Sequence, residues 1–211
     1  MNNANQQELS SAFIEVRKAY RLLYFYQRRV LDTVKYLTDA LGMRVQSGWS
    51  LYSENAPRNG RNLNLDLWAW DWLNMYMYEF YCGTKIIGDN SYQFAIQIQS
   101  DTGPFDEMVE ATNVEDFGPV DIASTRLLFI IGKNKWKNED ENAGDAYFYN
   151  IPTLKANENP IYIEKSDGDN KVFFLKSYLL ESFCDEESIL SNIRDFKTEL
   201  LNNNLPDIFK V

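Results

Sequence analysis

Apolar residues recur at alternating steps of four and three between residues 9 and 41, and this period constrains the fold more than any other feature of the sequence. Such spacing is typical of a helix that packs along one narrow stripe. No Pro or Gly interrupts the pattern before Gly42, a residue type that commonly follows the end of a helix. We therefore predict one helix over residues 5–41. Its stripe, called the seam, consists of Leu9, Phe13, Val16, Tyr20, Leu23, Gln27, Val30, Val34, Leu37 and Leu41.

The predicted helix is longer than the domain that would have to cover it. At ~1.5 Å per residue it extends for about 54 Å, whereas a compact chain of this length is roughly 43 Å across. Soluble monomers avoid long exposed apolar stripes, so we expect residues 1–42 to form an association element that binds a second copy or a protein partner, most simply as a homodimer. Gln27, the single polar seam residue, would then fix the register. The expected interaction residues are Leu9, Phe13, Val16, Tyr20, Leu23, Gln27, Val30, Val34 and Leu37.

Residues 43–211 have the pattern of an antiparallel body. Short apolar runs alternate with turn residues such as those of Asp167–Asn170, which predicts strands that pair in sequence order. Helical spacing of apolar residues from Ile189 to Leu200, after the capping residue Asp185, predicts a C-terminal helix. The fold class is therefore α+β, with a long N-terminal helix, a mainly antiparallel sheet of about five to seven strands and a C-terminal helix. Clear strands are expected at residues 48–53, 92–100, 126–131, 146–150, 161–165 and 171–180.

Residues 63–82 form the densest aromatic stretch of the chain. Read with a period of two, they predict a strand with a turn near Asp71 to Asn74, although a helix over residues 67–81 remains an alternative. In either case we expect residues 68–80 to be core and not a stacking surface for sugars or bases, because Trp and Tyr bring a large apolar area. One face of the strand would carry Trp68, Trp70, Trp72, Tyr76, Tyr78 and Phe80.

Residues 92–100 alternate cleanly between apolar and polar side chains. This alternation predicts a strand with one face in the core and one face in solvent. Tyr92, Phe94, Ile96 and Ile98 would point inward, and Gln93, Gln97 and Gln99 would point outward.

The composition removes several classes of chemistry. The chain has no His, which excludes Ser-His-Asp and Cys-His nucleophile systems as well as His-ligated zinc. Its two cysteines, Cys82 and Cys184, lack the spacing of a zinc or redox site, and no glycine pattern matches a phosphate-binding loop. We expect two thiols that pack as small apolar groups, no cofactor and no metal site.

Charge and hydropathy suggest the surroundings of the protein. The formal net charge is −10, and an acidic body repels phosphate backbones, so nucleic acid is an unlikely partner. The first residues lack the pattern of a leader, and no window is apolar enough for a membrane span, so we expect a cytoplasmic protein without membrane contact. A basic stripe lies on the helix, at Lys18, Arg21, Arg28 and Lys35. An acidic run lies at Asp106, Glu107, Glu110, Glu115, Asp116 and Asp121.

We expect a non-enzymatic interaction or regulatory protein that self-associates or binds a partner through its N-terminal helix and acidic surface. One alternative is a metal-dependent phosphodiester hydrolase that uses carboxylates alone, because Asp66, Asp71, Glu79 and Asp101 could converge if their strands are neighbours. These four carboxylates are the only catalytic candidates that the pattern offers. A second alternative is an acidic mimic of nucleic acid that inhibits a basic protein.

Overall fold

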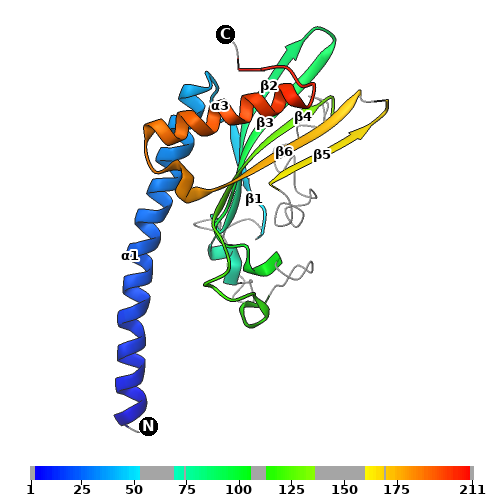
Figure 1. The fold of residues 1–211 in the computed structure, drawn as a ribbon. Coiled ribbons are helices and arrows are strands. Elements are labelled where there is room, and N and C mark those ends of the chain that lie inside the picture. The colour runs from blue at the N-terminus through cyan, green and yellow to red at the C-terminus, as the bar shows by residue number, and fades with distance from the viewer. Residues whose placement is uncertain are drawn as a thin grey trace, which may run out of the picture. The chain divides into compact units, whose positions relative to one another are not determined.

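The computed structural model describes residues 3–52, 69–73, 75–105, 113–135, 160–168 and 170–209, apart from the side chains of residues 3–6, 70, 71 and 105. The chain divides into two compact units, Met1–Tyr36 and Leu37–Val211. The predicted strand at residues 146–150 lies outside the described residues. Figure 1 shows the elements, which form the α+β arrangement expected from the sequence pattern.

Helix α1 (Asn3–Ala40) contains the whole predicted helical stretch except its last residue, and it begins two residues earlier than predicted. The helix ends in a Schellman motif. The backbone N–H of Met43 donates to the carbonyl of Thr38 at 2.8 Å, and that of Gly42 donates to the carbonyl of Asp39 at 3.2 Å. Gly42 adopts φ 64°, the left-handed conformation that this cap requires. The glycine therefore ends the helix for the reason that the sequence pattern indicated.

The second unit contains one six-stranded sheet in which every neighbouring pair of strands is antiparallel. The spatial order is β1-β2-β3-β4-β6-β5, so only the last two strands are exchanged relative to the chain. The strands are β1 (Ser47–Ser50), β2 (Met77–Ile87), β3 (Asn90–Gln99), β4 (Arg126–Lys133), β5 (Ile161–Ser166) and β6 (Lys171–Leu179).

The longest hairpin joins β2 to β3 through a two-residue turn, with Ile87 opposite Asn90. A β-bulge interrupts its register between Tyr81 and Gly83. Gly83 adopts φ 103° there, a conformation that side-chain-bearing residues rarely reach. The bulge leaves the pairing intact on either side of Cys82.

Helix α3 (Glu186–Asn202) covers one face of the sheet (Figure 1), which we call the α3 face. The ring of Phe196 from α3 lies 4.9 Å from Phe129 of β4 and 6.2 Å from Phe94 of β3, measured between ring centroids. Asp185 caps the helix as predicted, and its carboxylate accepts from the Ser188 backbone N–H at 2.8 Å. The aromatic rings of β3, β4 and α3 are thus the centre of this core.

The opposite face of the sheet, called the glutamine face, is buried as well. A second apolar cluster on this face joins β3, β4 and β6, and all five of its members are at most 1% exposed: Ala95, Leu128, Ile130, Phe173 and Leu175. The prediction of a half-exposed strand at residues 92–100 was therefore wrong. Gln93, Gln97 and Gln99 are also at most 1% exposed. Both faces of the central strands are core, so the polar side chains of β3 are enclosed with the apolar ones.

The aromatic stretch is not one strand. Residues Ala69–Trp72 form a short 3-10 helix, and the strand begins only at Met77. Trp72 is 60% exposed, so the prediction that it is core was wrong, whereas Phe80 is 6% exposed as expected. Trp68 and the side chain of Trp70 lie outside the described residues. The backbone N–H of Tyr76 donates to the carbonyl of Leu73 at 2.8 Å, which forms a turn between this helix and β2.

Candidate functional site

The first half of the seam is exposed along the first unit. Leu9, Phe13, Val16 and Tyr20 are 47–67% exposed, and Leu23 is 37% exposed. These five residues repeat at the helical spacing predicted for an association element, and α1 is helical throughout them. They form a continuous apolar stripe, which we call the exposed seam.

The later seam residues are covered. Val30, Val34 and Leu37 are at most 2% exposed within a single chain, and Gln27 is half-buried. Of the nine interaction residues expected from the sequence, the first five are exposed, Gln27 is half-buried, and the last three are buried. Any interaction through the seam has to use the exposed seam.

Small and apolar residues flank the exposed seam, together with the charged Arg17. Ala12 and Ala19 lie next to it on one side and Tyr24 on the other, and Tyr24 is 64% exposed. Two ion pairs lie elsewhere on the helix surface, from Lys18 to Glu15 at 2.8 Å and from Arg28 to Asp32 at 2.9 Å. Two residues of the predicted basic stripe are thus already neutralised within the helix. Small flanking residues allow a second helix to approach closely.

The four candidate carboxylates are not brought together by what the structure describes. Asp66 and the side chain of Asp71 lie outside the described residues. Glu79 is fully buried on β2, and Asp101 is half-buried just beyond the end of β3. Among the residues that the structure describes, no group of three or more Cys, Asp or Glu side chains is placed to hold a metal ion. The hydrolase therefore stays a hypothesis.

Asp101 has a local role at the end of β3. Its carboxylate accepts from the backbone N–H of Gly103 at 2.8 Å, which closes a turn. It also faces the hydroxyl of Tyr76, whose pKa is raised first by burial and then by the negative charge of Asp101. Tyr76 is therefore a neutral hydrogen-bonding group over the physiological range.

The two cysteines differ in environment. Cys82 is buried in β2 at the bulge, where burial followed by the charge of Glu79 raises the pKa of the thiol to about 12. Cys184 is exposed, and its sulfur lies 3.6 Å from the Ser188 hydroxyl. Cys82 is thus an unreactive core thiol, as the sequence suggested, but Cys184 does not pack in the core.

The sequence pattern did not predict the row of buried polar side chains on the glutamine face. Glu79 of β2 lies directly opposite Gln97 of β3, and Gln99 follows on the same face, opposite Met77. The side chains of Glu79, Gln97 and Gln99 are each at most 1% exposed. We call Glu79, Gln97 and Gln99 the buried polar row. The uninterrupted apolar run of the neighbouring strand at residues 126–131 already indicated that both faces were covered, and it was the available signal.

The fold and the exposed seam define an α+β protein that carries an apolar stripe on a long N-terminal helix. The chain belongs to the PM0109 family, whose model matches residues 6–205 and thus includes the exposed seam, the sheet and α3. No curated protein and no solved structure matches the chain. None of the helices within the described ranges is long and apolar enough to cross a bilayer.

Proposed function

We propose that this protein is a non-enzymatic interaction protein that self-associates as a parallel dimer through the exposed seam. The observation that supports the proposal is the exposure of Leu9, Phe13, Val16, Tyr20 and Leu23 at the a and d spacing of a coiled coil. A soluble chain rarely leaves a stripe of this length in contact with water.

The apolar area is sufficient for a dimer. Covering the exposed parts of five large side chains on each of two helices removes on the order of 600 Å² from water, worth about 15 kcal/mol. Association itself costs an estimated ~4–15 kcal/mol in lost freedom of motion. The difference is about 0–11 kcal/mol, a range that includes the ~8 kcal/mol of a dimer that forms at micromolar concentration and dissociates on dilution.

A parallel arrangement is favoured by the polar seam residue. In a parallel dimer Gln27 of one chain meets Gln27 of the other, and the two amides can bond to each other, since each has a donor and an acceptor. In an antiparallel dimer through the exposed seam, each Gln27 would instead lie near the start of the partner helix, away from the other Gln27. A pair of Gln27 amides just beyond the exposed seam therefore favours the parallel direction.

Cysteine cross-linking tests the arrangement. In a Cys184→Ser background, Leu23→Cys places a thiol at one end of the exposed seam, and Arg21→Cys places one beside it but off the seam. We expect mild oxidation to give a covalent dimer with Leu23→Cys and little with Arg21→Cys, since only a parallel dimer brings the two Leu23 positions face to face, whereas an antiparallel one would place Leu23 opposite Leu9. Equal yields from the two variants would contradict the parallel dimer.

A further inference from the structure

Helix α1 has a second exposed apolar surface, on the side opposite the exposed seam. Leu22 is 70% exposed, Phe25 is 68% exposed and Ile14 is 45% exposed. Helical spacing places these three residues roughly 140–160° around the helix axis from the middle of the seam. Lys18 and Arg21, which are also exposed, lie on the same side. We call Ile14, Lys18, Arg21, Leu22 and Phe25 the outer face.

The outer face is a basic surface on an acidic protein. Between residues 14 and 29 the helix has five basic residues and one acidic residue, whereas the whole chain has a formal net charge of −10. Lys18 is paired with Glu15, but both side chains are about two-thirds exposed, so this pair holds them only weakly. No acidic residue lies three or four positions from Arg21. The outer face therefore fits a surface that is both apolar and acidic.

The second unit has such a surface between β3 and β4, at residues 114–122, which we call the acidic segment. Three of its apolar side chains are 63–89% exposed: Val114, Val120 and Ile122. Its acidic side chains are exposed as well: Glu115, Asp116 and Asp121. No basic residue occurs anywhere from residue 104 to residue 123. The acidic segment thus has the charge and the apolar side chains that the outer face would match.

Backbone hydrogen bonds hold the acidic segment in shape. The N–H of Gly118 donates to the carbonyl of Gly103 at 3.0 Å, and that of Ile122 donates to the carbonyl of Pro119 at 3.1 Å. Residues Val114–Asp116 form a short 3-10 helix. These bonds do not use the exposed side chains. A surface that is already ordered loses less conformational freedom when it binds.

The turn between β2 and β3 is a less suitable match for the outer face. Ile86 and Ile87 are 65% and 40% exposed there. However, Lys85 and Asp89 flank them with opposite charges, so the turn has no net charge to attract a basic helix. Its exposed acid, Asp89, therefore offers a control position for the acidic segment.

We propose that the outer face of one chain binds the acidic segment of a second copy of this chain. Both surfaces are exposed within a single chain, and they match in their apolar side chains and in their opposite charges. Because the two surfaces differ, every chain offers one of each, and the contact links chains head to tail. It does not depend on the exposed seam, and it can join seam dimers into larger assemblies.

This contact is weaker than the seam contact. Each of its two surfaces has three exposed apolar side chains, whereas the exposed seam has five on each helix. Less apolar area is therefore removed from water. We expect the contact to form at hundreds of micromolar, above the concentration at which the seam dimer forms.

Sedimentation equilibrium of the Leu23→Asp chain, whose seam is disrupted, tests the contact by itself. We expect its average mass to rise by half or more between tens and hundreds of micromolar. Adding Phe25→Asp, which alters the outer face, or Asp121→Lys, which alters the acidic segment, should each abolish the rise. A mixture of these two variants should restore it, because one chain keeps an intact acidic segment and the other an intact outer face.

Asp89→Lys in the same Leu23→Asp chain is the matched control. It changes the net charge as Asp121→Lys does, but at the β2–β3 turn, so the mass should still rise with concentration. The proposal is wrong if the Leu23→Asp chain does not gain mass at hundreds of micromolar, or if the mixture of variants stays monomeric. A loss of association in Asp89→Lys equal to that in Asp121→Lys would also overturn it, since net charge alone would then control the association.

Discussion

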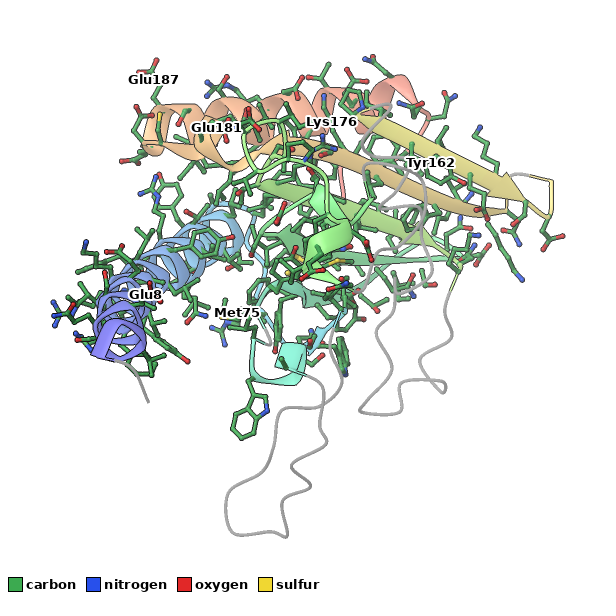
Figure 2. The ribbon with its side chains drawn as sticks, turned by 90° about the horizontal axis from the view of Figure 1, so that it is seen from below. Glu8, Met75, Tyr162, Lys176, Glu181 and Glu187 are labelled. Carbon is green, nitrogen blue, oxygen red and sulfur yellow. The ribbon has the colours of Figure 1, made fainter. Side chains whose placement is uncertain are left out.

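The Nζ of Lys176 lies 2.6 Å from Oδ2 of Asp195, and this contact ties β6 of the sheet to the middle of α3. The Lys176 side chain is 10% exposed, whereas that of Asp195 is 47% exposed. Figure 2 shows Lys176 between the sheet and α3. The hydroxyl of Tyr178 donates to the same oxygen of Asp195 at 2.7 Å, so one carboxylate holds two groups of β6. The α3 face thus contains a nearly buried lysine that forms an ion pair with a helix residue.

Removing the two partners should have unequal effects. Asp195→Ala removes the closest carboxylate described beside the nearly buried ammonium of Lys176 and leaves Glu199 at 3.8 Å, so we expect it to destabilise the protein by about 2–3 kcal/mol. Lys176→Met removes the buried charge and leaves a half-exposed carboxylate, so it should cost less than about 1 kcal/mol. Urea unfolding of the two variants measures the difference. Equal losses would contradict this account of the contact.

Asp195 should also make stability depend on acid pH. Burial disfavours the charged carboxylate, but hydrogen bonds from Lys176 and Tyr178 outweigh this effect and hold its pKa below the ordinary value of 3.8. Because the folded pKa is below the unfolded one, the stabilisation is complete above pH 3.8 and is lost as the pH falls through the folded pKa. The Tm difference between wild type and Asp195→Asn should therefore be constant near neutral pH and shrink below pH 3.8. A difference that persists at lower pH would contradict the lowered pKa.

The bulge of β2 should not tolerate a side chain at Gly83. The φ of 103° is strained for any residue other than glycine, and a Cβ there would also displace the end of the Gln46 side chain. We expect Gly83→Ala to cost about 2–3 kcal/mol. Gly88→Ala is the control, since Gly88 also has a positive φ but a Cβ there would meet nothing within 4 Å, and its cost should be about 1 kcal/mol. Chemical unfolding of both variants measures which substitution lowers the free energy of unfolding more.

The elements that the sequence predicted well are those with a long, regular signal. The seam period and Gly42 predicted α1 to within two residues, and the spacing from Ile189 to Leu200 predicted α3. These patterns report the local geometry of a helix and do not depend on what lies across the fold. The antiparallel class followed for the same reason, from short strands joined by turn residues.

The predictions that were wrong are those about which side chains are buried. The alternation of β3 showed which residues share a face but not that the glutamine face is core, because burial depends on neighbouring strands such as β4. Likewise the aromatic run predicted apolar burial at Trp72, where a 3-10 helix leaves the ring 60% exposed. The hydrogen bonding of Gln97 and Gln99 could not be predicted at all, since partners across a sheet are set by register. The sequence therefore predicted which types of residue are present but not which contacts they make.

The mass of the protein in solution tests the proposed self-association most directly. Sedimentation equilibrium at tens of micromolar should give twice the 24.7 kDa of one chain for the wild type. Leu23→Asp should give the monomer mass with unchanged α+β circular dichroism, since it places a charge in the exposed seam. The adjacent Leu22→Asp should keep the dimer mass, because Leu22 is 70% exposed but lies off the seam. A wild-type protein that stays monomeric at these concentrations, or a dimer that survives Leu23→Asp, would contradict the proposal.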